Sequence, residues 1–380
     1  MLFASPIITN RENMLRIREK LLSYNYKIST ILSRLKIKKY RSNRPSNEEI
    51  PHKINNFLSR SPTDETDILI RVFTLNTPTD IKLFKKIFSD FELSMLVDMK
   101  LVSLSDDNNT VDSDIALFEC DDLIIATDSV VKKSIGINPV MPLFQECYEF
   151  DAIRTRKKVN KTLDICTGSG IHALLASRHS EKVTGVDISP RAIMFSKFNA
   201  ALNDIRNINF IEGDLYEPIG EESFDLILAN PPYMPMTDSL PGANWYCGGK
   251  KGDALWSKII QGLKNHLNIN GLCQMIHLMI FDNNKNYEEK LNSFIGESSY
   301  HYSTIVMSDP IDFKNENITD TSIVEFGVTN IRRNETINKN FYCHVPFVIP
   351  LSFDVNDLFS ALIDASTKGE MQEIVKSFYL

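Results

Sequence analysis

The stretch KTLDICTGSG, residues 161–170, decides the fold class, because an apolar strand-like run passes directly into a glycine turn. Helical periodicity follows over residues 171–178. Gly168 and Gly170 permit a tight turn and a close approach of a ligand to the backbone, and the helix that follows begins with free N–H groups. The stretch therefore predicts a strand, a ligand-binding turn and a helix in succession.

Strand-like and helical segments alternate beyond this stretch. The strand-like segments are 161–166, 181–187, 207–212, 224–229, 271–281, 301–308 and 321–333, and the helical ones are 171–178, 190–203 and 252–267. Alternation on this scale predicts an α/β fold with a doubly wound, mostly parallel, seven-stranded Rossmann-like sheet. The last two strands are expected to form a hairpin at the edge of that sheet.

The first third of the chain has a different pattern. Apolar residues recur at helical spacing over residues 14–35, which predicts two short helices broken around residues 23–27, and residues 42–51 are typical of a linker. Three helical patterns follow over residues 66–104, and residues 115–128 are typical of paired short strands. The expected N-caps of the three helices are Asp67, Thr79 and Ser89. Three small helices and a β-hairpin indicate a winged helix, a module that binds DNA or serves as a dimerisation arm.

These patterns divide the chain into three expected regions. Residues 1–135 form a helical and winged-helix-like domain, and residues 136–335 form the ligand-binding domain. Residues 336–380 form a C-terminal extension with one or two helices.

The composition is that of a soluble globular protein, with 43% hydrophobic and 24% charged residues. No apolar run approaches the roughly 20 residues that span a bilayer, so we expect a cytoplasmic protein with no membrane segment. The six cysteines are scattered without a CxxC pair, which predicts reduced thiols. His172 and His179 lie near each other in the sequence but have no third ligand nearby, so no metal site is expected.

The net charge of −7 is unevenly distributed, because residues 1–60 carry 13 Lys and Arg against 4 Asp and Glu. The basic residues within 11–44 could contact nucleic acid, but a solvated amphipathic helix has the same composition. A nucleic-acid partner therefore stays open, as does a homodimer formed through the N-terminal domain.

The candidate ligand-binding residues follow the strands of the predicted sheet, where an open α/β sheet binds its ligands. The first strand leads into Asp164 and the glycine turn, and the second ends in Asp187, whose carboxylate can accept both hydroxyls of a ribose. The third is followed by Asp214 and Leu215, a carboxylate and an apolar side chain that suit an adenine. The candidates together are Asp164, Thr167, Gly168, Gly170, Asp187, Ile188, Asp214, Leu215 and Asn230. Their order and spacing predict a nucleoside pocket.

A dinucleotide-binding oxidoreductase is one alternative, because that fold also uses a glycine turn and an acid after the second strand. A pyrophosphate needs a turn clear of negative charge, whereas Asp164 closes the first strand here. A carboxylate at this point suits a cationic ligand such as S-adenosylmethionine, which carries an ammonium and a sulfonium group.

The fourth strand ends in FDLILANPPYMP, residues 224–235. The nitrogen of an amide or an exocyclic base amine is a poor nucleophile because its lone pair is delocalised. The Asn230 side-chain oxygen and the Pro231 carbonyl could accept its N–H groups and raise its electron density, while Tyr233 offers a face for stacking. Asn230, Pro231 and Tyr233 are therefore the candidate catalytic residues.

The segments Asp164 to Gly170 and Asn230 to Tyr233, with Asp187 and Asp214, resemble the motifs of class I S-adenosylmethionine-dependent methyltransferases of the Asn-Pro-Pro-Tyr type. These enzymes include release-factor glutamine methyltransferases and amino-methylating DNA and ribosomal RNA enzymes. The resemblance covers residues 136–335. It implies that Asp187 binds the ribose, that Asp214 lies near the adenine, and that Asn230 and Tyr233 contact the acceptor nitrogen.

The resemblance leaves the methyl acceptor open. Residues 248–255 resemble the Gly-Gly-x-x-Gly-hydrophobic stretch of the glutamine group, but that group usually has Pro-Arg where this chain has Pro142 followed by Leu143. A protein amide or small molecule is favoured by the acidic body, nucleic acid is the second possibility, and a non-catalytic nucleotide-binding regulator is the third. Trp245, Tyr246 and Trp256 could line a substrate pocket or pack in the core.

Overall fold

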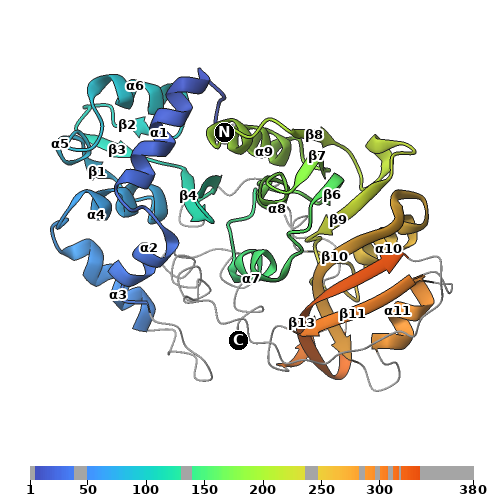
Figure 1. Cartoon of the computed structure of the whole chain (residues 1–380). Coiled ribbons are helices and arrows are strands. Elements are labelled where there is room, and N and C mark those ends of the chain that lie inside the picture. Colours follow the sequence, from blue (N-terminus) through green and yellow to red (C-terminus); the bar gives the residue numbers. More distant parts are fainter. Residues whose placement is uncertain are drawn as a thin grey trace. The chain divides into compact units, whose positions relative to one another are not determined.

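The computed structural model of the chain (Figure 1) describes residues 5–37, 49–129, 139–235, 247–281, 287–295, 300–306, 311–315 and 318–333. Two compact units divide these residues. The described residues of the first unit lie within Met1–Tyr148 and Lys197–Arg206, and those of the second lie within Glu149–Ser196 and Asn207–Pro350. The expected boundaries after residues 135 and 335 stay predictions, and the helices expected within residues 336–380 lie outside the described residues.

The second unit is built on one sheet with the strand order β11-β13-β10-β9-β6-β7-β8, and β12 pairs with β13 in addition. The strands are β6 (Val159–Ile165), β7 (Ser180–Asp187), β8 (Ile208–Glu212), β9 (Phe224–Ala229), β10 (Leu267–Phe281), β11 (Tyr300–Val306), β12 (Ile311–Asn315) and β13 (Ile318–Arg333). The pairs from β8 to β10 are parallel, and β13 is antiparallel to β10 and β11. The predicted mostly parallel, doubly wound sheet is therefore confirmed. The expected antiparallel pair at the sheet edge is confirmed, because β11 and β13 are neighbours with β11 outermost, and β12, which also pairs with β13, lies between them in the chain.

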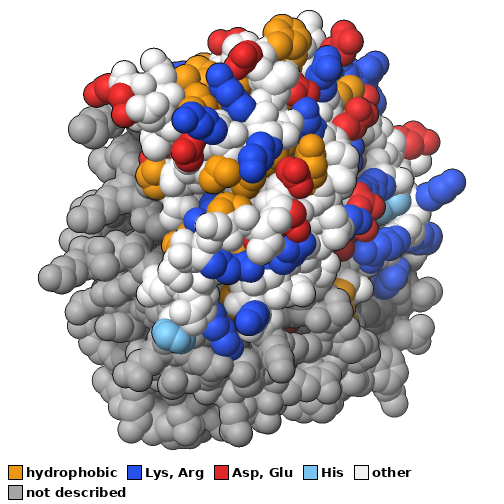
Figure 2. All heavy atoms as spheres, turned by 90° about the vertical axis from the view of Figure 1, so that its left-hand side faces the viewer, with side chains coloured by type: hydrophobic (Ala, Val, Ile, Leu, Met, Phe, Trp, Pro, Cys, Tyr) orange, Lys and Arg blue, Asp and Glu red, His pale blue; other side chains and the backbone are white. Residues whose placement is uncertain are grey.

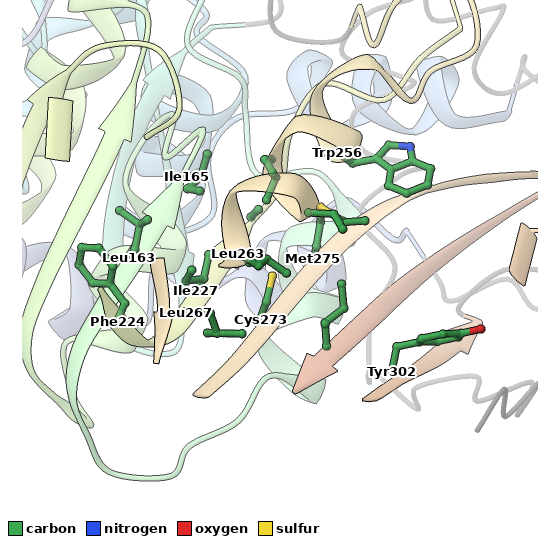
Figure 3. Close-up of a cluster of buried hydrophobic side chains, with 14 of the residues drawn as sticks. Leu163, Ile165, Phe224, Ile227, Trp256, Leu263, Leu267, Cys273, Met275 and Tyr302 are labelled. Carbon is green, nitrogen blue, oxygen red and sulfur yellow. The ribbon is translucent and has the colours of Figure 1, made fainter. Parts of the chain in front are cut away.

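Helices cover both faces of this sheet. They are α7 (Gln145–Ile153), α8 (Ile171–Ala176), α9 (Pro190–Leu202), α10 (Ala254–His266) and α11 (Tyr287–Ile295). Successive residues of β9 face opposite sides, so Ile227 packs in the cluster that includes α10 and α11, while Leu226 and Leu228 pack with Phe150 of α7 and Ala176 of α8. Figure 3 shows the first cluster, in which side chains of β6, β9, β10 and α10 point toward one another. Burial of both faces explains why β9 is almost continuously apolar.

Three polar side chains inside the sheet join β10, β13 and β11. His277 Nε2 lies 2.8 Å from Thr329 Oγ1, which lies 3.0 Å from Thr304 Oγ1, and all three residues are completely buried. Burial lowers the pKa of His277 to about 4, so the ring is neutral near pH 7. A shift of one residue in the strand pairing would leave these groups without partners, so the chain of hydrogen bonds fixes the register.

The first unit begins with α1 (Arg11–Ser23) and α2 (Ile28–Arg34), as predicted, with a break at Asn25, whose φ is 53°. The next helix, α3 (Glu49–Ser59), begins inside the segment expected to be a linker. The linker prediction is therefore wrong from Glu49 on, and its earlier part lies outside the described residues.

A small helical and stranded module follows. Its elements are α4 (Glu65–Leu69), a π-helical turn (Ile70–Thr74), β1 (Thr79–Asp80), α5 (Ile81–Phe84), α6 (Asp90–Asp98), β2 (Ser103–Leu104) and β3 (Thr110–Asp112). The strands form a three-stranded sheet with the order β1-β3-β2.

One of the three expected N-caps in this module is correct. Ser89 caps α6 in a capping box with Glu92. The cap of α4 is Asp64, because the expected Asp67 is buried inside the helix and accepts hydrogen bonds from Thr63. The cap of α5 is Asp80, which follows the expected Thr79 and accepts from the N–H of the second helical residue at 2.7 Å.

The predicted paired strands are β4 (Ile115–Cys120) and β5 (Leu123–Asp128), which form a hairpin. The last turns of α9 belong to the same unit. There the Asn199 amide accepts from the N–H of Ala126 at 2.8 Å and donates to its carbonyl at 3.0 Å. Asn203, one helical turn later, makes the same pair of bonds with Ile124 at 2.9 and 2.8 Å. Two side-chain amides thus satisfy backbone groups of β5 as a neighbouring strand would.

Candidate active site

The strand register brings the predicted site residues to one edge of the sheet. Ile165, the last residue of β6, pairs with Val186 of β7 and with Ala229, the last residue of β9. Asp187, the last residue of β7, pairs with Glu212, the last residue of β8. Because these four strands are parallel and end level with one another, the residues that follow them lie at a common edge.

Asp164 is deeply buried, with 1% of its surface exposed. Its Oδ2 accepts hydrogen bonds from Thr167 Oγ1 at 2.5 Å and from the N–H of Ala173 at 3.0 Å. Burial raises the pKa of Asp164 to about 7, and the charge of Asp187 adds to the rise. Its Oδ1 has no hydrogen-bond partner among the described residues. A buried carboxylate oxygen without a partner is costly, and a cationic group of a ligand would stabilise it.

Asp187 ties the glycine turn to the start of α9. Its Oδ2 accepts from the N–H of Gly168 at 2.8 Å, and its Oδ1 accepts from the N–H of Ser189 at 2.9 Å. Burial raises the pKa of Asp187. A Cβ atom at Gly168, where φ is 55°, would meet nothing within 4 Å, whereas one at Gly170 would lie 3.0 Å from Ser196 Cβ. Gly170 is therefore required by packing, while Gly168 borders open space beside Asp187.

A third carboxylate, Asp214, lies in the same neighbourhood. The pKa of the Cys166 thiol is raised, first by burial and then by the negative charges of Asp187, Asp164 and Asp214. The three carboxylates therefore lie close enough to one thiol for each charge to act on it. The sequence analysis did not name Cys166 as a residue of the candidate site. Its position between Asp164 and the glycine turn was a signal that could have identified it as one.

The apolar candidates differ in exposure. Ile188, directly after Asp187, is 63% exposed, which is high for an isoleucine. Leu215 has a φ of 48° and is partly buried against the core cluster that contains α10. Both positions border the carboxylates along the chain, and their roles toward an adenine stay predictions.

These residues fit S-adenosylmethionine. The unpartnered Asp164 oxygen and the surrounding carboxylates favour a cation and oppose an anion such as a pyrophosphate. The open space at Gly168 allows a ligand to approach the main chain. Within the described parts of the chain, no group of three or more His, Cys, Asp and Glu side chains is arranged to hold a metal ion.

Asn230 follows β9 at the same edge and is half-buried. Its side chain makes no hydrogen bond among the residues that the structure describes. The amide oxygen and the amide NH2 group are therefore both available to a ligand. Pro231 and Tyr233 are buried, and Tyr233 is 9% exposed. Met234 forms a parallel bridge with Cys247, so the chain after the Asn-Pro-Pro-Tyr motif lies against the glycine-rich segment that begins at Gly248.

One aromatic candidate is a core residue. Trp256 is 2% exposed, its ring stacks on His277 at a centroid distance of 5.3 Å, and Phe294 packs edge-on to it at 5.1 Å. The interpretation of Trp256 as a pocket residue is therefore wrong, and the alternative of core packing is correct. Trp245 and Tyr246 lie outside the described residues.

Four basic residues in the described part of the N-terminal arm, residues 11–44, form ion pairs within the first unit. Lys20 and Arg16 form ion pairs with Glu92, at 2.6 and 3.3 Å. Lys27 pairs with an aspartate at 2.8 Å, and Arg34 pairs with another at 2.5 Å. Lys27 and Arg34 each face an aspartate, whereas Arg16 and Lys20 share the single charge of Glu92. No helix among the described residues is long and apolar enough to cross a membrane.

Comparisons with known proteins show what this chain is similar to. Residues 150–304 match the family model of the Methyltransferase small domain. The release factor glutamine methyltransferase of Thermodesulfovibrio yellowstonii is 31% identical over 159 residues, which are 37% of this chain and 57% of that protein. The ribosomal protein uL3 glutamine methyltransferase of Xanthomonas campestris is 34% identical over 126 residues, 30% of this chain and 41% of that protein. The match to each of these relatives thus spans less than two thirds of its length. These matches confirm the resemblance to class I S-adenosylmethionine-dependent methyltransferases of the Asn-Pro-Pro-Tyr type.

Proposed function

We propose that this chain is an S-adenosylmethionine-dependent methyltransferase that methylates the side-chain amide nitrogen of a protein. The observation that carries the proposal is the common edge where three carboxylates and the glycine turn meet Asn230. The relatives support an amide acceptor, because their names describe methylation of glutamine in a release factor and in a ribosomal protein.

Asp164, Asp187 and Asp214 are the residues that hold the cofactor. Asp164 offers its unpartnered Oδ1 to a positive charge, and Thr167 keeps the other oxygen in place. Asp187 is held by two backbone N–H groups, so its remaining lone pairs have a fixed direction toward hydroxyl donors. When bound, S-adenosylmethionine supplies a methyl group on a positively charged sulfur, which is open to attack by a nitrogen.

Asn230 and Pro231 prepare the acceptor nitrogen. An amide nitrogen shares its lone pair with the carbonyl group, so it attacks poorly until its N–H groups are held by acceptors. The Asn230 side-chain oxygen and the Pro231 carbonyl oxygen accept these N–H groups, which raises the electron density on nitrogen and restricts its orientation. Tyr233 packs against the planar amide.

The nucleic-acid alternative is not favoured. A protein that binds a phosphate backbone needs cations that are free to contact it. In the described part of the arm, Arg16, Lys20, Lys27 and Arg34 are ion-paired within the first unit. On the face in Figure 2, Lys and Arg side chains are interspersed with Asp and Glu rather than gathered in one basic patch.

We propose that residues 65–112, rather than helices with the hairpin at residues 115–128, form the winged-helix module of the first unit, and that it binds a protein. The order of helices and strands and the sheet order β1-β3-β2 support this assignment. In DNA-binding helix-turn-helix proteins, the recognition helix lies in the major groove, between the two phosphate backbones. Here α6 carries the exposed Asp90 and Asp98, and the turn after β2 carries Asp106 and Asp107. Negative charge at these positions opposes DNA and permits a protein partner. A homodimer through this unit and a cytoplasmic location stay predictions.

The test uses S-adenosylmethionine with a labelled methyl group, incubated with the purified chain and separate protein, nucleic-acid and metabolite fractions of cells. Label in the protein fraction, released by complete proteolytic digestion as N5-methylglutamine, is the expected result. Label in nucleic acid alone would overturn the protein acceptor but keep methyl transfer. The absence of label in every fraction, together with no cofactor binding by calorimetry, would refute the function itself.

A further inference from the structure

The glycine-rich segment that follows the Asn-Pro-Pro-Tyr motif lies directly against the main chain of Tyr233. A Cβ atom at Gly248 would lie 2.8 Å from both Cα and the carbonyl carbon of Tyr233. A Cβ atom at Gly252 would collide with the Tyr233 carbonyl oxygen and would lie 3.4 Å from the nitrogen of Pro235. Two glycines thus touch the same peptide unit, and neither position has room for a side chain.

Backbone hydrogen bonds hold the two segments together. The N–H of Gly248 donates to the carbonyl of Met234 at 2.8 Å, and Met234 bridges to Cys247. Within the glycine-rich segment, the N–H of Gly252 donates to the carbonyl of Gly249 at 3.0 Å. Gly249 and Gly252 have φ values of 83° and 69°, a region that other residues rarely adopt. The turn is therefore tight, and its shape depends on glycine.

The far end of the turn is attached to the core of the second unit. The N–H of Ala254, the first residue of α10, donates to the carbonyl of Gly248 at 3.0 Å. Asp253 forms an ion pair with Lys290 of α11, and Lys290 Nζ lies 6.0 Å from the ring centroid of Trp256. Because Trp256 is a core residue, the turn has a fixed support behind it.

We infer that Gly248 and Gly252 are positioning residues, which set the main-chain position of Tyr233 and so the geometry at the acceptor nitrogen. This inference rests on the proposed function, in which Pro231 and Tyr233 contact the acceptor amide. Ordinary contact with a Cβ atom begins near 3.4 Å, so an alanine at either position would have to push the Tyr233 peptide away from the turn. A displacement on the order of 1 Å at a reacting group costs about 100-fold in rate.

The test compares Gly252→Ala with Gly220→Ala. Gly220 also has a positive φ, 59°, but a Cβ atom there would meet nothing within 4 Å. The control therefore carries backbone strain without a collision with the motif. We expect Gly252→Ala to reduce labelling of the protein fraction by about 100-fold, with the calorimetric Kd for S-adenosylmethionine within about twofold of the unmodified chain. Gly220→Ala should keep both values.

Crystal structures of the two variants separate this inference from the proposed function. A displaced Tyr233 peptide in Gly252→Ala, and an unmoved one in Gly220→Ala, is the expected result whether or not an acceptor is known. Unchanged labelling by Gly252→Ala, or an unmoved Tyr233 peptide in its structure, would overturn the inference. Gly248→Ala, whose collisions are milder, replaces Gly252→Ala if that variant does not fold, with the same two outcomes.

Discussion

The two halves of the candidate site are built by different means. Around the glycine turn, carboxylates are fixed by hydrogen bonds to nearby groups, as Asp164 is by Thr167 and Asp187 is by Gly168. At the Asn-Pro-Pro-Tyr motif, the Asn230 amide has no hydrogen bond among the described residues, and Tyr233 is held by main-chain packing against glycines. The carboxylates near the glycine turn are buried at an energetic cost that a bound cation would reduce. At the Asn-Pro-Pro-Tyr motif, the Asn230 amide can still form hydrogen bonds, and the backbone around it is rigid. Cofactor binding and methyl transfer should therefore respond to different mutations.

Asn230→Ala gives the strongest test of this separation. The variant loses the side-chain acceptor for the attacking nitrogen, so we expect kcat to fall by about 100-fold to 1000-fold. The Kd for S-adenosylmethionine should change by no more than about threefold, because Asn230 follows β9 while the three carboxylates lie near the ends of β6, β7 and β8. Radiolabel transfer measures the first quantity and calorimetry the second. Wild-type activity in this variant would contradict the acceptor role.

Asp187→Ala should show the converse behaviour. Loss of a charged acceptor costs about 1.5–3 kcal/mol, so we expect cofactor affinity to fall by about 10-fold to 100-fold in calorimetry. The matched control is Asp225→Ala at the other end of the sheet, because Asp225 also accepts two backbone N–H groups, from Asn160 and Lys161 at 3.0 Å. Equal losses of cofactor affinity in both variants would mean that Asp187 acts only through stability.

The pH dependence of cofactor binding tests whether the Asp164 carboxylate pairs with the cationic cofactor. Its pKa is raised to about 7 in the ligand-free chain, and only its ionised form can pair with a cation. Affinity for S-adenosylmethionine should therefore rise by about tenfold from about pH 6 to about pH 8 and level off above that. In Asp164→Asn the profile should be flat over this range and the affinity lower. A steep profile that survives in the asparagine variant would assign the titration to another group.

The folding free energy has the opposite dependence on this carboxyl. Because its folded pKa lies above the ordinary value of 3.8, Asp164 contributes stability at acid pH that is lost as the pH rises through about 7.

The smallest expected effect lies away from the site, in the polar chain of the sheet. Thr329→Val removes the partner of His277 Nε2, which should lower the free energy of unfolding by about 1–3 kcal/mol in urea titration. Cofactor affinity, measured where the variant is fully folded, should be unchanged. His277→Phe in the same background should recover part of the loss, because it removes the unpaired ring nitrogen. An unchanged unfolding midpoint for Thr329→Val would show that this chain of hydrogen bonds does not stabilise the sheet.

The sequence predicted the features that depend on local signals. The strands that end at Asp187 and Asn230, and the turn at Gly168, follow from apolar periodicity and glycine chemistry within a few residues. The N-cap of α4 was missed because two aspartates stand three residues apart, and only burial of Asp67 distinguishes it from Asp64.

Features that depend on distant segments could not be predicted in this way. The place of β13 inside the sheet is set by its pairing with both β10 and β11. The core position of Trp256 depends on Phe294 and His277, which come from α11 and β10. The need for glycine at Gly252 arises from the carbonyl of Tyr233, 19 residues earlier in the chain. In each case the deciding contact comes from a segment that no local pattern identifies.

The pairing of α9 with β5 has a consequence for attempts to cut this protein into pieces. The helix starts beside Asp187 and finishes with Asn199 and Asn203 bonded to β5. A fragment that begins after residue 148 would keep the helix but discard the strand, so two amides that are now buried would lose their acceptors and donors. The methyltransferase fold of this chain should therefore not be excised without the β4–β5 hairpin. A fusion protein or a domain graft must include that hairpin.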